Sequence, residues 1–106
     1  IKDVIIRKGE NISAKEVEDL LAAHPAVREV AVVGLPDELL GERACAVVVP
    51  ADPATPPTLA ALTDFLRAQG LMVQKLPEQL AIVDALPRNS MGKVEKTRLR
   101  ERFDDL

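Results

Sequence analysis

The chain has 106 residues and a formal net charge of −3, and 47% of its residues are hydrophobic but only 2% are aromatic. This length allows one domain, whose core must consist of Val, Leu, Ile and Ala, and the acidic balance argues against a nucleic-acid-binding domain, which is normally basic. The single cysteine, Cys45, excludes an internal disulfide and a cysteine-based zinc site. Its apolar surroundings in the sequence predict a buried, structural thiol.

The sequence contains no apolar run near the roughly 18 residues needed to span a bilayer, and it lacks the layout of a signal peptide. We therefore expect a cytoplasmic protein. With one histidine and no suitably spaced carboxylates, no metal site is expected. Because strand-like residues begin almost directly at Ile1, without a methionine, we expect the chain to be a fragment or an isolated domain.

The first predicted elements are two extended segments, Val4–Lys8 and Glu10–Ile12, on either side of Gly9. Their arrangement favours a small hairpin. Ser13 then provides a helix N-cap, and Glu16 three residues later completes a capping-box pattern. Apolar residues at helical spacing follow, which predicts an amphipathic helix.

The remaining sequence predicts three strands and two further helices. The strands are Val27–Val33, Arg43–Val49 and Leu80–Asp84, and the helices run from Thr55 or Thr58 to Gly70 and from about Val94 to Phe103. A loop through Gly34 to Gly41 joins the first two strands. This order predicts an α+β fold, a three-stranded sheet flanked by helices, together with the N-terminal β-hairpin.

The segment between the last strand and the last helix places Lys93 on a turn. Pro87 stiffens the entry to this turn, and Gly92 allows the backbone to change direction sharply. An ammonium group presented in this way suits an anion, such as a phosphate or a carboxylate. A phosphate-binding P-loop is excluded, because that motif needs Gly where Pro87 stands and Ser or Thr where Val94 stands.

Three motifs resemble, in the same order, those of the adenylate-forming enzymes, the superfamily of acyl- and aryl-CoA synthetases, peptide-synthetase adenylation domains and luciferases. The stretch Pro87–Lys96 meets every fixed position of the family pattern Pro-Arg-x-x-x-Gly-Lys-x-x-Lys/Arg. Lys2–Glu18 resembles the hinge motif of the family, and Val30–Gly34 followed by Pro36-Asp37 and Gly41-Glu42 resembles a third motif. The resemblance covers nearly the whole chain. It implies that residues 1–106 form the small, mobile C-terminal domain, and that the large N-terminal domain is absent from the chain.

The resemblance implies an adenylation role for Lys93. In the family, a carboxylic acid attacks the α-phosphate of ATP, which is bound with Mg²⁺, and pyrophosphate leaves. Lys93 stands at the position of the lysine whose ammonium group stabilises the transition state. Arg88, Gly92 and Lys96 are supporting residues of the same motif. For Lys96, orientation of the turn, ligand contact and no special role are all open.

The resemblance also implies a second pose of the domain, in which a thiol attacks the acyl-adenylate. Lys2 aligns with the hinge about which the domain would rotate. Gly9 aligns with the glycine that lines the pantetheine tunnel, where a side chain would collide with the entering arm, although a hairpin turn also explains a glycine here. Arg7 and Lys8 either meet the phosphates of coenzyme A or are solvated charges.

The primary prediction is therefore the C-terminal domain of an ATP-dependent acyl-CoA synthetase, which would be inactive alone because the substrate pocket and nucleotide loop belong to the larger domain. One alternative keeps the adenylation step but transfers the acyl group to a carrier protein. The other is a stand-alone binding or regulatory module without catalysis. Besides the N-terminal domain, ATP, the acid and coenzyme A, a lysine acyltransferase and deacylase would be further partners if Lys93 is acylated, as this lysine is in relatives.

Overall fold

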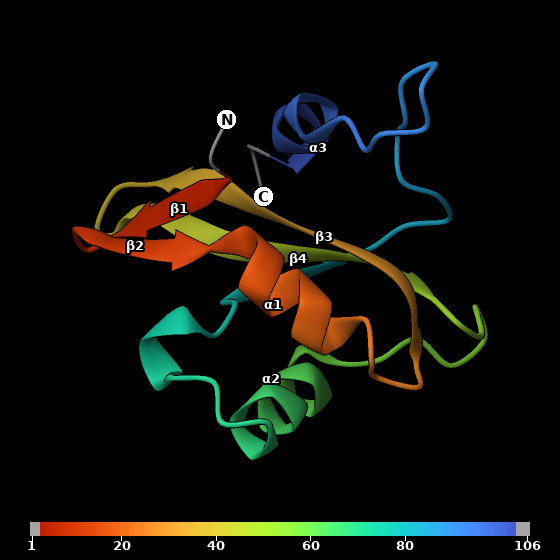
Figure 1. The fold of residues 1–106 in the computed structure, drawn as a ribbon, viewed down its shortest axis with the longest axis horizontal. Helices are drawn as coiled ribbons and strands as arrows, with labels where there is room; N and C mark the ends of the chain where they lie inside the picture. The colour runs from red at the N-terminus through yellow and green to blue at the C-terminus, as the bar shows by residue number, and fades with distance from the viewer. Residues whose placement is uncertain (1–2, 104–106) are drawn as a thin grey trace.

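In the computed structural model, residues 3–103 are described, and their strands form one five-stranded sheet with α-helices on both faces (Figure 1). The elements in chain order are β1 (Val4–Arg7), β2 (Glu10–Ser13), α1 (Ala14–Leu21), β3 (Val27–Asp37), β4 (Gly41–Pro50), α2 (Leu59–Ala68), a 3₁₀ turn (Val73–Lys75), β5 (Gln79–Ile82) and α3 (Lys96–Phe103). None of the helices in this part of the chain is long and apolar enough to cross a membrane.

Strand β4 lies at the centre of the sheet. It pairs antiparallel with β3 along its whole length and parallel with β5 over residues 45–48. The β1–β2 hairpin joins the same sheet through the antiparallel pair of Arg7 and Gly41. The predicted α+β class, with three central strands and an N-terminal hairpin, is therefore confirmed, and the hairpin proves to be a hydrogen-bonded part of the central sheet.

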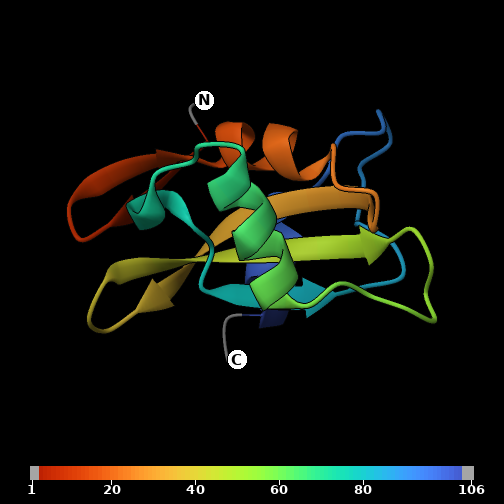
Figure 2. The ribbon, with the colours of Figure 1, turned by 90° about the horizontal axis from the view of Figure 1, so that it is seen from below.

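Both faces of the sheet are covered. Alternate residues of β3 and β4 point to opposite sides, so that Val32, Ala46 and Val48 pack with α1 and α2, whereas Val33, Cys45 and Val47 pack with α3. Figure 2 shows α1 and α2 on the side away from α3. Strands that are buried on two faces are apolar at consecutive positions rather than at every second one, which explains the continuous hydrophobic runs in the sequence.

The turn between β3 and β4 is shorter than the predicted loop. The two strands remain paired as far as Asp37 and Gly41, because the Asp37 carboxylate holds the turn. Its Oδ1 atom accepts the backbone N–H groups of Leu39 and Leu40 at 3.0 and 2.9 Å. Gly41 follows with a φ of +86°, a backbone conformation that side-chain-bearing residues rarely adopt.

The helix caps agree with the sequence except in one detail. Ser13 Oγ accepts the N–H of Glu16 at 3.2 Å, and Thr58, not Thr55, caps α2 through the N–H of Ala61 at 3.1 Å. The Glu16 carboxylate pairs with Lys75 Nζ at 3.0 Å. Glu16 thus connects α1 to the segment before β5 instead of returning to its own helix cap as the capping-box pattern predicts.

Candidate functional site

The segment 87–95, here called the Lys93 loop, folds back on itself. Arg88 and Val94 form an isolated antiparallel bridge, the N–H of Asn89 donates to the carbonyl of Lys93 at 2.9 Å, and the N–H of Glu95 donates to the carbonyl of Pro87 at 2.8 Å. These bonds close a small hairpin between β5 and α3. The predicted turn is therefore an ordered structure, with Lys93 on its returning strand.

Asn89 organises the tip of this loop, a role that the sequence reasoning missed. Its Oδ1 atom accepts the N–H groups of Met91 and Lys93 at 2.9 and 3.0 Å. Gly92 follows with a φ of +83°. An Asn shortly before a Gly is a recognised turn signal, because its side chain can replace a backbone acceptor, so local turn chemistry would have identified it.

Arg88 joins the loop to the body of the domain. Its Nη1 atom donates to the carbonyl of Gly92 at 2.7 Å, and its Nη2 atom pairs with Glu29 on β3. A guanidinium group can make both contacts at once because its donors are arranged as a planar fork. Arg88 thus attaches the loop to β3, while the side chain of Lys93 remains exposed.

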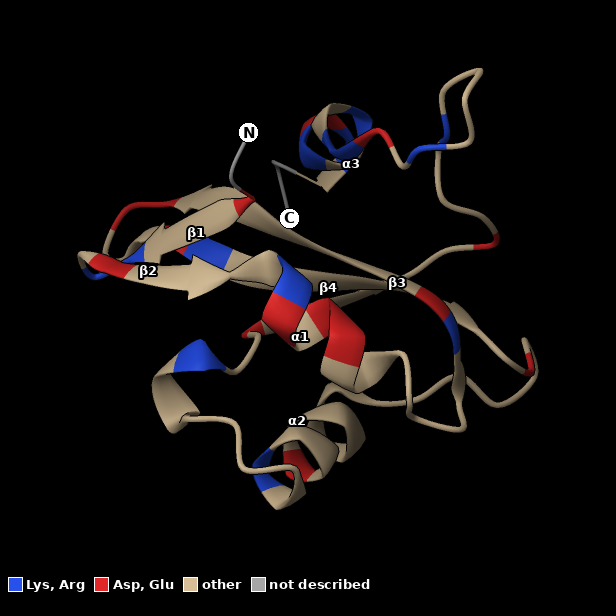
Figure 3. Ribbon diagram, in the orientation of Figure 1, with Lys and Arg blue, Asp and Glu red and all other residues tan. Residues whose placement is uncertain are grey.

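The side chain of Lys93 is exposed, and within residues 3–103 its ammonium group makes no hydrogen bond or ion pair. It borders an open groove of about 620 Å³, to which Lys96 and Arg100 of α3 and Glu18 and Asp19 of α1 also contribute. Figure 3 shows the basic residues of α3 and the acidic residues of α1. Lys93 is therefore a cation on an ordered loop that is free to meet an anion from outside the described chain.

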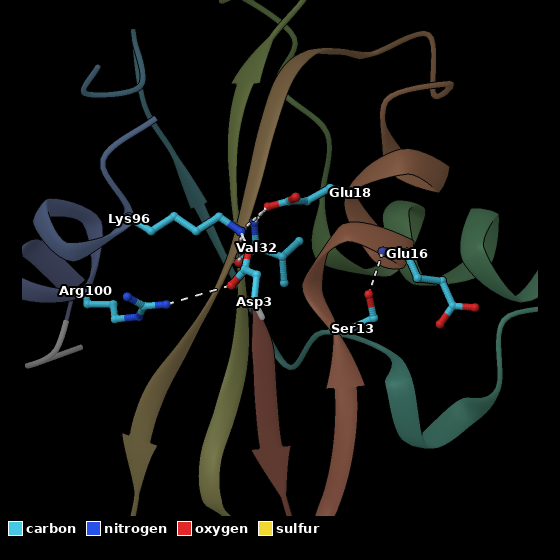
Figure 4. Close-up of polar contacts among 7 residues, drawn as sticks. All are labelled: Asp3, Ser13, Glu16, Glu18, Val32, Lys96 and Arg100. Atoms are coloured by element: carbon cyan, nitrogen blue, oxygen red, sulfur yellow. Dashed lines mark hydrogen bonds and ion pairs between the residues drawn. The ribbon is translucent and has the colours of Figure 1, made fainter. Parts of the chain in front are cut away.

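Lys96, three residues later, has a different environment (Figure 4). Its side chain is only 18% exposed, and its Nζ atom contacts Asp3, the Glu18 Oε2 atom at 2.7 Å and the Val32 carbonyl at 3.1 Å. An ammonium group has three N–H donors, and here three acceptors surround it. In this arrangement Lys96 connects α3, α1, β3 and the start of β1, and it has no donor left for a ligand.

The β1–β2 hairpin carries the second set of predicted residues. Its turn consists of Lys8 and Gly9, which have φ values of +52° and +78°. Two successive residues in the left-handed region are typical of the type I′ turn that closes two-residue hairpins. A Cβ atom at Gly9 would meet nothing within 4 Å inside this domain, so only the backbone conformation requires a glycine here.

Arg7 and Lys8 are placed differently although they are adjacent. Arg7 Nε lies 2.6 Å from Glu78 Oε2, and Arg7 Nη1 donates to the Gln74 carbonyl at 2.6 Å. Arg7 therefore attaches the hairpin to the segment before β5. Lys8 is exposed at the turn, and of the two cations it is the one available to a phosphate.

The Lys93 loop and the Gly9 turn lie at opposite ends of the molecule, as Figures 1 and 2 both show. The structure thus brings Arg88, Gly92 and Lys93 together in one place and Arg7, Lys8 and Gly9 in another. Lys2, the predicted hinge residue, lies outside the described residues.

Cys45, in the core, has no place in the candidate chemistry. Cys45 is fully buried, and burial raises the pKa of its thiol to about 11. Among residues 3–103, no group of three His, Cys, Asp or Glu side chains is arranged to hold a metal ion.

Residues 16–93 match the family of AMP-binding enzyme C-terminal domains. The chain is 50% identical over 102 residues to pyochelin synthase PchD of Pseudomonas aeruginosa. It is 45% identical over 104 residues to 2,3-dihydroxybenzoate-AMP ligase of Bacillus subtilis, and 42% identical over 100 residues to medium-chain fatty-acid–CoA ligase of Escherichia coli. These alignments cover 96%, 98% and 94% of the chain but 18%, 19% and 18% of the relatives.

Comparison of the fold with solved structures indicates the same family. Apo MatB from Rhodopseudomonas palustris matches with a TM-score of 0.90 at 42% identity, over 98% of this chain and 20% of MatB. The chain belongs to the family of AMP-binding enzyme C-terminal domains, the small domains of adenylate-forming enzymes. It spans about a fifth of the length of the curated relatives it matches.

Proposed function

We propose that this domain is the mobile C-terminal part of an ATP-dependent acid–thiol ligase, which activates a carboxylic acid as an acyl-adenylate and then transfers the acyl group to a thiol. In this proposal a large N-terminal domain binds MgATP and the acid, and the present domain brings Lys93 to them. Since ATP is a cytoplasmic substrate, the proposal keeps the cytoplasmic location expected from the sequence.

One observation carries the proposal: Lys93 has no partner among the described residues of its own domain, yet its loop is fixed by a network of hydrogen bonds. A surface lysine without a function needs no such support. Charge-stabilising groups in active sites, by contrast, work best when they are held in position before the reaction begins.

The chemistry follows from the charge of the ammonium group. When a carboxylate oxygen attacks the α-phosphate of ATP, negative charge is spread over the phosphoryl oxygens and the departing pyrophosphate. Lys93, docked into a cleft closed by the larger domain, would stabilise this charge in surroundings from which water is excluded. The opposite position of the Gly9 turn supports a cycle of two poses, since one rotation would exchange the two ends at a single active site.

The identity of the accepting thiol has two candidates. One relative is named as a medium-chain fatty-acid–CoA ligase, and another is named as a 2,3-dihydroxybenzoate-AMP ligase. The expectation of coenzyme A rested partly on Arg7 and Lys8 as a pair of cations, but Arg7 is occupied by Glu78. We therefore propose coenzyme A and the phosphopantetheine arm of a carrier protein as comparable acceptors, with Lys8 as the contact for phosphate in either case.

The test uses an enzyme that contains this domain together with the large domain. In Lys93→Ala, adenylate formation, measured as pyrophosphate release, should fall by about 10²–10³-fold, which corresponds to roughly 2.7–4 kcal/mol. Thioester formation from supplied acyl-adenylate should change much less. An equal loss in both half-reactions would contradict the two-pose proposal.

The acceptor is decided by a competition assay on the same enzyme. Free coenzyme A and a phosphopantetheinylated carrier protein are offered at equal concentration, and the thioester products are separated. Enzyme that makes no adenylate from any acid in the presence of MgATP would instead favour the remaining alternative, a binding or regulatory module that has kept the fold without catalysis.

A further inference from the structure

The third sequence motif, around Gly34 and Gly41-Glu42, lies against the β1–β2 hairpin. Glu42 Oε1 accepts the backbone N–H of Ile6 at 2.8 Å, and the Leu40 carbonyl accepts the N–H of Lys8 at 2.8 Å. The residues at the start of β4 thus hold the segment of β1 that leads directly to the Lys8–Gly9 turn.

Other contacts also fix this strand, because Ile5 is buried in the core and Arg7 contacts Glu78 and the Gln74 carbonyl. Among the described residues, the one backbone pair between β1 and β4 is that of Arg7 and Gly41. The neighbouring residue Ile6 is 52% exposed. A hydrogen bond to an ionised carboxylate is roughly twice as strong as one between neutral groups. Glu42 is therefore one of several contacts that attach the hairpin to the sheet, and it acts on the backbone that leads directly to the Lys8–Gly9 turn.

Gly34 on β3 makes room for this carboxylate. A Cβ atom at position 34 would lie 2.7 Å from Glu42 Oε2 and 3.0 Å from its carboxyl carbon. The φ of Gly34 lies outside the left-handed region, so its backbone conformation is open to other residues. Space for Glu42 is thus a physical reason for glycine at this position, because a methyl group there would force the end of the Glu42 side chain to move.

We propose that Glu42, kept in place by the absence of a side chain at Gly34, is a positioning residue for the thiol-transfer half-reaction. This inference rests on the proposed function, in which the Gly9 turn lines the path of the thiol arm. Displacement of a positioned group by about 1 Å can cost a large factor in rate. Glu42 sets the position of the turn from a distance and touches no reacting atom.

The test measures the two half-reactions separately in the enzyme that contains both domains. In Glu42→Ala, thioester formation from supplied acyl-adenylate should fall at least about tenfold, which corresponds to about 1.4 kcal/mol, while adenylate formation stays within about twofold of the wild type. Glu42→Gln is the matched control. Its amide oxygen can still accept from Ile6 but carries no charge, so the loss of thioester formation should be smaller than in Glu42→Ala, with adenylate formation unchanged.

Gly34→Ala provides an independent variant that keeps the carboxylate but displaces it. It should show the same selective loss as Glu42→Ala. When both substitutions are combined, the added methyl group has no carboxylate to displace, so the double variant should be no slower than Glu42→Ala alone. Additive losses would overturn the proposed relation between the two residues, and an unchanged thioester rate or an equal fall in both half-reactions of Glu42→Ala would overturn the positioning role.

Hydrogen exchange of the segment 4–9, measured by mass spectrometry on the same enzyme, separates the structural claim from the functional one. Glu42→Ala should accelerate exchange there, and unchanged exchange would overturn the tether itself. If the wild type forms adenylate but no thioester with either coenzyme A or a carrier protein, the proposed function fails, whatever the exchange result.

Discussion

The Lys93 loop and the β1–β2 hairpin are both compact turns, but they are held in place differently. The loop is closed by its own residues, above all by Asn89, whose side chain accepts two N–H groups of the turn. The hairpin is positioned by residues far away in the sequence, such as Glu42 and Glu78. Local bonds therefore close the turn that presents Lys93, with Arg88 joining it to Glu29 on β3, whereas the place of Gly9 depends on the whole sheet.

Lys96 is the link between the two regions. It begins α3, directly after the Lys93 loop, and it contacts Asp3 directly before β1. Variants at Lys96 should therefore affect both the Lys93 loop and the β1–β2 hairpin. Variants within one of these two regions should affect that region alone. Substitutions at Lys96, at three glycines and at Cys45 test this distinction.

Lys96→Met should lower the free energy of unfolding of the chain by about 2–3 kcal/mol, because it leaves the half-buried carboxylates of Asp3 and Glu18 without their cation. This is below the roughly 3–5 kcal/mol of a fully buried pair, since both carboxylates keep some contact with water. Urea unfolding measures the change. Lys15→Met is the control on the same groove, because the pair of Lys15 and Asp19 is largely exposed, and no measurable loss of stability is expected. Equal losses in the two variants would show that Lys96 is not a structural link.

Three glycines allow a direct comparison of the regions. Gly9, Gly70 and Gly92 all have positive φ values, +78°, +87° and +83°, and at each a Cβ atom would meet nothing within 4 Å. Each replacement by Ala should therefore lower the free energy of unfolding by a similar amount, about 1 kcal/mol, because of backbone strain. In the enzyme with both domains, Gly92→Ala should slow adenylate formation about tenfold and Gly9→Ala should slow thioester formation about tenfold. Gly70→Ala is the control and should change neither rate. A loss of both rates in Gly9→Ala would break the assignment of one region to one half-reaction.

The alkylation rate of Cys45 shows whether a variant has loosened the core that both regions share. Alkylation requires the thiolate, and burial keeps the pKa near 11, so labelling with iodoacetamide at about pH 8 should be slow in the folded chain and fast in urea. Gly9→Ala and Gly92→Ala should leave this rate unchanged, whereas Lys96→Met should raise it. Fast labelling of the folded wild type would contradict the buried position of the thiol.

The same thiol has a defined influence on the pH dependence of stability. Its folded pKa of about 11 lies above the ordinary value of 9.0, so the folded state favours the neutral form. The contribution is fully present below about pH 9 and is lost as the pH rises towards 11. Replacement of Cys45 by Ala should therefore flatten the fall in stability over this range, which urea titrations at several pH values would detect.

The order of the helices and strands and the candidate lysine could be predicted from the sequence alone, although several element bounds could not. Ser13, the β-branched runs of the central strands, and the local pattern around Gly92 each act through neighbours within a few residues, and such short-range effects can be read from one chain. Asn89 belongs to the same class, because its bonds reach only two and four residues along the chain.

The partners of the charged residues became visible only in the folded chain. Arg7 and Lys8 are alike in sequence, yet Arg7 is bound by Glu78, which is far away along the chain, and Lys8 is exposed. Lys93 and Lys96 differ in the same way, because the acceptors of Lys96 come from the residue before β1, from α1 and from β3. The reason is physical: an ion pair depends on which side chains the fold brings within a few ångströms, and that distance has no fixed relation to separation along the chain.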